Sequence, residues 1–289
     1  MGSRIGTNYT KTAALMALLI GVLLFVGNAV GGYQGMALWG GFGVVLNFGM
    51  WWFSDRLALM ANRARPVTRE ELPEVYEIVE ELTQRAKLPM PRIYVIPSAS
   101  PNAFATGRGP AHAAVAVTEG ILGLLNRRQL RAVLGHELAH VLNRDTLIST
   151  IAAAVAGLVG AAGYALRWGF ILGTGDRGGR RRGGGLGELA LIIVAPFVAM
   201  VVQLAISRSR EYGADASGSA LSEDPGALAD ALEALERGAA ARPYEYAGPA
   251  TAHLFIVNPF AGRALAGLFS THPPIDQRVE RLRRMALKY

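Results

Sequence analysis

A short run near the middle of the chain carries the residue types of a metallohydrolase. The sequence GHELAH, residues 135–140, contains the pattern H-E-x-x-H. On a helix, positions i and i+4 lie one turn apart on the same face, so the imidazoles of His136 and His140 can converge on one tetrahedral Zn²⁺. Glu137, next to the first imidazole, can reach a water on that metal and accept its proton. These groups predict metal-assisted hydrolysis, a chemistry suited to peptide bonds.

A catalytic zinc needs a third protein ligand and an open fourth position. The candidate is Glu211, in the sequence SRSREYGAD at residues 207–215. Asp215 follows it by four residues, so the two carboxylates share a helix face. One can bind the metal while the other accepts an N–H from a ligating imidazole. By spacing alone, the alternative is a solvated helix face.

Two uncharged apolar stretches precede these motifs. Residues 12–30 and 36–53 are joined by a short Gly-containing turn. As helices rising ~1.5 Å per residue, they reach across a hydrocarbon core of ~30 Å, and the tryptophans of the second stretch suit its interfaces. We therefore predict a transmembrane hairpin. The alternative for the first stretch is a cleaved signal peptide.

Two more apolar stretches, 147–166 and 189–206, predict a second hairpin between the motif regions. Basic residues before and after the first hairpin place both of its ends in the cytoplasm by the positive-inside rule. The Arg- and Gly-rich segment 174–187, which joins the second pair, conflicts with that rule. The second pair therefore either crosses against the rule or does not fully cross.

Composition narrows the function classes. The chain has 51% hydrophobic residues and a net charge of +7, from 29 Lys plus Arg against 22 Asp plus Glu. Such a balance first suggests nucleic-acid binding, but the basic residues flank apolar segments without interleaved aromatic residues. They favour anionic lipid headgroups instead, so we expect a lipid bilayer and no nucleic acid as partner. The absence of cysteine excludes disulfides, thiol nucleophiles and Cys-ligated metals.

Short helices and strands must position the chemical groups. We expect an amphipathic helix over 66–87, with Thr68 as N-cap and Glu71 completing a capping box. Strands at 92–96 and 113–117 enclose a loop at 97–110, and a short turn or helix follows at 119–125. Further helices are predicted over residues 126–143, 207–221, 225–238 and 274–287.

Three motifs occur in order: H-E-x-x-H at 136–140, R-E-Y-x-A-D at 210–215 and T-H-P-P at 271–274. Together they resemble the M48 family of membrane zinc metallopeptidases, and within it the HtpX-like heat-shock proteases. The resemblance covers nearly the whole chain. It implies an α+β, mostly helical, zincin-like metallopeptidase domain with a small β-sheet and about four hydrophobic membrane helices. We divide the chain into a hairpin at 1–54, a first catalytic part at 55–146, a second hairpin at 147–206 and a second catalytic part at 207–289.

The resemblance also assigns roles at the metal. It implies one Zn²⁺ per chain, bound by His136, His140 and Glu211. Glu137 becomes the base and proton shuttle, and Asp215 orients a ligand.

Two later residues match family positions near the active site. The resemblance implies that His272 and Arg278 stabilise the oxyanion, as donors near the metal would. The alternatives are a helix-start residue for His272 and a surface ion pair for Arg278.

The sequence NAFATG at 102–107 resembles the family's Asn-Ala loop. Asn102 would bind substrate backbone, or it forms a turn. Val115 and Val117 lie on the 113–117 strand, which we expect to pair as an edge strand with an extended substrate.

The function expected from the resemblance is that of a zinc metalloendopeptidase for protein quality control under stress. It would be a multi-pass protein of the cell (plasma) inner membrane that cleaves misfolded membrane proteins or peptides at the cytoplasmic face. One alternative is a non-catalytic membrane scaffold or metal sensor, against which the presence of Glu137 argues. Another is a metallopeptidase specialised for prenylated or similar peptides, as in other branches of the family.

Overall fold

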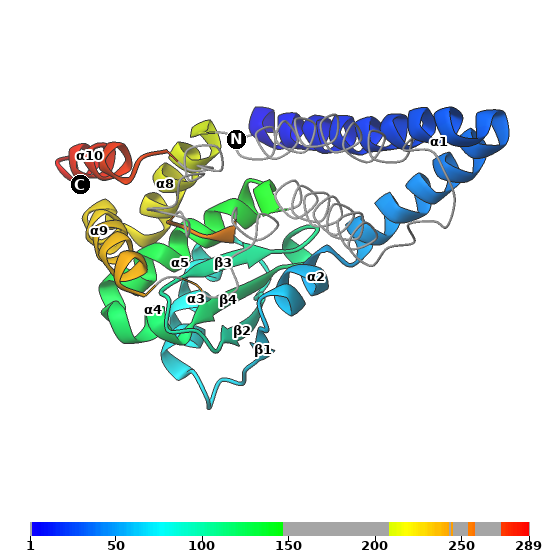
Figure 1. Ribbon diagram of the computed structural model, residues 1–289. Helices are drawn as coiled ribbons and strands as arrows, with labels where there is room; N and C mark the ends of the chain where they lie inside the picture. The colour runs from blue at the N-terminus through cyan, green and yellow to red at the C-terminus, as the bar shows by residue number, and fades with distance from the viewer. Residues whose placement is uncertain (1, 147–207, 243, 245–253, 258–272, 289) are drawn as a thin grey trace.

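The computed structural model describes residues 2–146, 208–242, 244, 254–257 and 273–288 (Figure 1). Helices surround a small sheet, and a long helical hairpin extends from this domain. The apolar stretches at 147–166 and 189–206, the Arg-rich segment between them and His272 lie outside the described residues.

The sheet has four strands in the order β1-β2-β4-β3. The central strands β2 (Arg92–Ile96) and β4 (Ala114–Thr118) run parallel. The edge strands β1 (Arg65–Pro66) and β3 (Ala103–Thr106) are antiparallel to their neighbours. The two predicted strands are confirmed, but β4 is an interior strand, so the prediction that it forms the sheet edge is wrong.

Strand β3 lies inside the region predicted as a loop. All four of its residues are buried, and Ala103 pairs with Val117 while Thr106 pairs with Ala114. A strand buried on both faces shows no alternation of polar and apolar residues. Its conformation comes from pairing with β4, which the local sequence does not reveal.

The helices of the domain follow the predicted order. They are α3 (Pro73–Ala86), α4 (Glu119–Leu124), α5 (Arg127–Leu142), α8 (Arg208–Ser222), α9 (Pro225–Ala241) and α10 (Ile275–Ala286), with a short 3₁₀ turn at Pro110–His112. The predicted start of α3 at Thr68 is wrong. The Thr68 N–H does bond to Glu71 at 2.9 Å, but in a turn before the helix, which begins where Pro73 supplies a preset φ at the first helical position.

Helix α5 lies at the centre of the domain. It packs against α3, α8, α9 and strand β3, and its residues from Ala132 to Ala139 are all buried. Asn126 caps its start, accepting from the Gln129 N–H while the Gln129 side chain bonds back. The helix therefore holds the H-E-x-x-H residues in a dry, fixed position.

Helices α5 and α8 cross at two glycines. A Cβ on Gly218 would lie 2.6 Å from the His136 Cα, and one on Gly135 would lie 3.0 Å from the Gly218 carbonyl oxygen. Glu211, Asp215 and Gly218 are spaced by four and three residues, so they share the face of α8 that meets α5. This close crossing brings the two carboxylates to the histidines.

The N-terminal hairpin is one element, α1 (Gly2–Trp52), broken at Gly31 and Gly32. Gly32 has φ 58° and ψ −145°, a conformation that glycine adopts readily because it has no Cβ. The two halves pack closely where Gly27 meets Gly35, and the Asn47 side chain donates to the Met16 carbonyl at 3.1 Å. The predicted helical hairpin is confirmed as a packed pair.

The packing of the hairpin does not by itself show that its helices cross a membrane. No single helix among the described residues is both long and apolar enough to cross a bilayer. The segments Gly31–Trp52 and Asp55–Ala61, bent by 75° relative to each other, satisfy length and composition together. The second of these forms most of α2 (Ser54–Ala61), which packs on β3.

The α5–α8 crossing predicts the effect of one methyl group. Gly218→Ala should lower the midpoint of thermal unfolding of the detergent-solubilised full chain, because overpacking costs ~1–3 kcal/mol and outweighs the gain in helix propensity of about 1 kcal/mol. Gly123→Ala in α4 is the matched control, since a Cβ there meets nothing within 4 Å. An unchanged or higher midpoint for Gly218→Ala would show that the crossing is not tightly packed.

Candidate metal centre

Three side chains from α5 and α8 bring ligand atoms together. His136, His140 and Glu211 each offer one such atom, all within 4.8 Å of one another. The two Nε2 atoms are 3.2 Å apart, and the Glu211 carboxylate oxygens lie 3.8 Å from His136 Nε2 and 3.7 Å from His140 Nε2. His136 and Glu211 are buried and His140 is nearly so. The structure thus brings together the three residues that the sequence motifs predict as metal ligands.

Each imidazole has its own carboxylate on the opposite ring nitrogen. His136 Nδ1 lies 3.0 Å from Asp215, and His140 Nδ1 lies 3.1 Å from Asp145. An ionised carboxylate only accepts, so both Nδ1 atoms carry hydrogen in the neutral rings. When both rings are neutral, as metal ligation requires, their Nε2 lone pairs therefore point into the same space.

This arrangement fits a tetrahedral zinc ion. Two nitrogen ligands ~2.0–2.1 Å from zinc lie about 3.3 Å apart in tetrahedral geometry, close to the 3.2 Å observed. Carboxylates that hold the far nitrogen of a ligating imidazole fix its tautomer and orientation. His136, His140 and Glu211 could therefore hold the metal, oriented by Asp215 and Asp145.

Asp145 was not predicted from the sequence. It lies beyond the end of α5, after Arg144, whose φ of 61° turns the chain back toward the helix. The aspartate follows His140 by five residues, which is not a spacing of a shared helix face. The position of the carboxylate depends on this left-handed residue, for which the sequence gives no clear signal.

Arg278 lies inside the site, so the surface-ion-pair alternative is wrong. Its side chain is fully buried and donates to both oxygens of Asp215, at 3.0 and 2.7 Å. Its Nη1 is 3.7 Å from Glu211 Oε2. Burial opposes ionisation of Asp215, but the Arg278 charge and the hydrogen bonds from His136 and Arg278 outweigh it and lower the aspartate pKa to about 2. Arg278 therefore keeps Asp215 ionised beneath His136.

The pKa of the second imidazole, His140, is set by several opposing effects. Burial opposes the charged form of His140, yet the hydrogen bond to Asp145 and the carboxylates of Glu211 and Glu137 raise its pKa to about 9. Without a cation, the ring thus retains a proton to offset the surrounding negative charge. Metal binding must release that proton.

Glu137 points into the same cavity from α5. Its carboxylate is almost fully buried and accepts the Ala105 N–H of strand β3 at 2.9 Å. Burial raises the Glu137 pKa, against the charges of His136 and His140, which lower it. Glu137 is therefore anchored to the sheet edge and has increased proton affinity.

A cavity of about 50 Å³ lies between these groups and a later segment of the chain. Its wall includes Phe104, Thr146 and the segment Leu254–Ile256 in addition to the polar site residues. Leu254 belongs to the apolar cluster on the Phe104 face of the sheet, and Ile256 belongs to the core cluster on the opposite face, which includes Ala103 and Ala105. The segment therefore crosses the outer edge of β3.

Asn102 holds this segment in place. Its side-chain amide donates to the Leu254 carbonyl at 3.2 Å and accepts the Ile256 N–H at 3.1 Å. The side chain is buried. The predicted contact of Asn102 with substrate backbone is therefore wrong for this structure: the amide is occupied by the chain's own backbone and shapes the cavity wall.

Val115 and Val117 do not form a substrate-binding edge. Both are completely buried, and β4 is paired with β2 on one side and β3 on the other. The expected edge is instead β3, where the Ala105 N–H points away from β4 to Glu137.

Asp145 provides a test of the assembled centre. Asp145→Ala should weaken zinc binding by ~10–100-fold, because loss of a carboxylate that orients a ligating imidazole has that effect. Competition with a chromophoric chelator measures the dissociation constant. Asp276→Ala at the exposed start of α10 is the control. Equal zinc affinity in both variants would rule out the orienting role.

Comparison with known proteins agrees with this geometry. The model of peptidase family M48 matches residues 69–286, which include all three ligand residues, Glu137 and Asp145. Superposition on the crystal structure of S. mikatae Ste24p gives a TM-score of 0.48 at 18% identity, covering 98% of this chain and 67% of that chain. That similarity is too low to add to the argument.

Sequence relatives match over nearly their full length. A protease HtpX homolog from Syntrophobacter fumaroxidans is 50% identical over 287 residues, which cover 99% of this chain and 100% of the relative. Homologs from Thermococcus sibiricus and Pelotomaculum thermopropionicum are 48% and 49% identical, covering 96% and 97% of this chain and 96% and 100% of their own. The chain belongs to peptidase family M48 and is a metalloprotease.

Proposed function

We propose that the chain is a membrane-anchored zinc endopeptidase that cleaves misfolded membrane proteins at the cytoplasmic face. The observation that carries the proposal is the buried convergence of His136, His140 and Glu211 beside the Glu137 carboxylate. Two imidazoles and one carboxylate, with a cavity left at a fourth position, suit a catalytic zinc ion. One such ion per chain is expected.

The protein's own groups handle the proton. Zinc, when bound, supplies a Lewis acid and lowers the pKa of water. Glu137 lines the cavity and accepts a proton from the attacking water, then delivers it to the leaving amine. Its raised pKa supports both directions of transfer. The Ala105 N–H keeps the carboxylate aimed into the cavity during these steps.

The substrate is expected to lie along β3. An extended peptide can add to a sheet edge through main-chain hydrogen bonds. Strand β3 is the edge strand beside Glu137 and the cavity, and in this structure the Leu254–Ile256 segment occupies part of that edge. His272 remains our candidate for stabilising the oxyanion. The Arg278 guanidinium donates to both oxygens of Asp215, so we expect it to act by positioning that carboxylate. Its positive charge also lies near Glu211.

The α1 hairpin is the proposed anchor. Phe25, Phe42 and Val45 leave half or more of their surface exposed, which suits contact with lipid chains. Basic residues at both ends of the hairpin support a cytoplasmic position for the catalytic domain, by the positive-inside rule. The proposal includes a multi-pass plasma-membrane location and a quality-control role under stress, and the resemblance to the HtpX-like proteases supports both.

A substitution at Glu137 distinguishes an enzyme from a non-catalytic metal-binding scaffold. Glu137→Gln should retain one zinc per chain but lose cleavage of a membrane-protein substrate by ~10²–10⁴-fold, the usual contribution of a general base. Zinc is measured by mass spectrometry of the metal and cleavage by gel assay in proteoliposomes. Glu119→Gln, at an exposed position of α4, controls for the loss of one carboxylate. Undiminished cleavage by Glu137→Gln would refute the assigned mechanism.

A further inference from the structure

Helix α2 directly follows the hairpin and has two distinct faces. Asp55, Ala58, Leu59 and Asn62 are buried, and their spacing of three and four residues puts them on one side of the helix. This inner face packs on the domain: Ala58 and Leu59 join Phe104 of β3 in one apolar cluster. Asp55 pairs with Arg92 of β2. The helix is thus fixed to the sheet that carries the metal site.

The opposite face is exposed and carries three large apolar side chains, with the charged Arg56 at its border, 5.8 Å from the Phe53 ring centroid. Phe53 at the N-cap is 44% exposed, Leu57 44% and Met60 74%. At about 100° per residue, these three side chains project within roughly 60° of one another. Three large apolar side chains on one side of this short helix and its N-cap form a stripe whose exposure to water is unfavourable.

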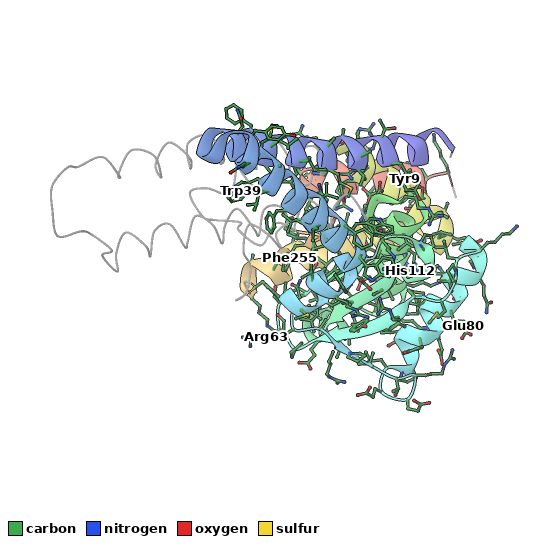
Figure 2. The ribbon with its side chains drawn as sticks, turned by 90° about the vertical axis from the view of Figure 1, so that its right-hand side faces the viewer. Tyr9, Trp39, Arg63, Glu80, His112 and Phe255 are labelled. Atoms are coloured by element: carbon green, nitrogen blue, oxygen red, sulfur yellow. The ribbon has the colours of Figure 1, made fainter. Side chains whose placement is uncertain are left out.

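The stripe continues the exposed apolar surface of the hairpin. Among the residues that the structure describes, all large exposed hydrophobic side chains except Met90, Leu124 and Leu287 lie between Tyr9 and Met60. In Figure 2 the chain descends from Trp39 on the hairpin to Arg63 just past α2, whereas Glu80 lies on the opposite side of the domain. The apolar surface therefore ends with α2.

The geometry and charge at this end fit the bilayer surface. The axis of α2 is bent by 75° from the second half of the hairpin, so a hairpin that crosses the bilayer leaves α2 close to the membrane plane. Trp52 ends the hairpin, and the Arg108 guanidinium lies 4.3 Å from its ring centroid and donates to its carbonyl at 3.0 Å. Tryptophan and arginine together are typical of the headgroup level.

We infer that α2 is an interfacial helix: its Phe53–Leu57–Met60 stripe lies in the headgroup region of the bilayer that holds α1. This inference rests on the membrane anchoring in the proposed function. A short helix with one apolar and one protein-bound face can lie with the apolar side ~5–10 Å into the headgroup and acyl boundary. The inner face then holds β3, and with it Glu137 and the metal ligands, directly at the membrane surface.

This placement has a consequence for substrate access. Arg108 follows β3 by two residues and contacts the end of the hairpin, while α2 packs on β3 from the other side. The edge proposed to pair with substrate is therefore held near the point where a chain leaves the bilayer. A polypeptide emerging from the membrane would reach the site within a short extended segment.

Label depth in vesicles tests the inference. Because the natural chain has no cysteine, Leu57→Cys, Met60→Cys, Val45→Cys and Glu236→Cys each give a single site for a nitroxide label. Each full-length variant is reconstituted in phosphatidylcholine–phosphatidylglycerol vesicles. Power-saturation EPR compares the label's accessibility to oxygen and to a water-soluble nickel chelate. Val45 marks the hairpin, and the exposed Glu236 of α9 marks the aqueous domain.

The expected oxygen-to-nickel ratio at positions 57 and 60 is several-fold above that at 236 and below that at 45. Ratios at 57 and 60 equal to that at 236, with 45 in hydrocarbon, would overturn the interfacial helix and leave the membrane anchor intact. Ratios equal to that at 45 would make α2 part of the span and also overturn it. A water-exposed label at 45 would remove the membrane anchor and the inference together.

Discussion

The metal centre depends on the close crossing of α5 and α8 at Gly135 and Gly218. Helix α5 supplies both imidazoles and Glu137, whereas α8 supplies Glu211 and Asp215 from a part of the chain about 70 residues later. The two backbones must approach within side-chain length for a single carboxylate to reach both histidines. The crossing also buries the carboxylates of Glu137, Asp145, Glu211 and Asp215, near two guanidinium groups: Arg278 is bonded to Asp215, and Arg210 lies near Asp145 and Glu211. Buried charges are costly unless they are paired, so this cluster is balanced best when a divalent cation joins it.

Strand β3 links the metal centre to the sheet and, through α2, to the hairpin. Glu137 accepts a hydrogen bond from strand β3, and Asn102 immediately before β3 holds the segment that closes the cavity. On its other side, β3 shares an apolar cluster with α2. A small edge strand thus joins the proton-transfer residue, the cavity wall and the helix that leaves the hairpin. Its residues are short or apolar, and their importance comes from backbone groups and position.

The sequence predicted the parts of this site that follow helical spacing. The H-E-x-x-H pair and the Glu211–Asp215 pair each lie on one helix face, and motif order identified Glu211 as the ligand. Residues placed by irregular backbone or by long-range pairing were harder to assign. Asp145 reaches His140 only because Arg144 adopts a left-handed conformation. Strand β3 forms by pairing with β4, so it looked like a loop. Val115 and Val117 were predicted to lie on an edge strand, but their strand, β4, lies in the interior of the sheet. Asn102 was expected to bind a substrate backbone, and it binds the chain's own.

The central claim is that His136, His140 and Glu211 hold one divalent metal ion between two helices. Zinc content of the purified full-length protein after dialysis against zinc-buffered solution tests it most directly, with Glu211→Ala compared against Glu223→Ala, whose carboxylate lies on the surface. The account predicts one zinc per chain in the natural protein and in Glu223→Ala, and a content well below one in Glu211→Ala. Full zinc content in Glu211→Ala at the same free zinc concentration would contradict the assignment of the third ligand.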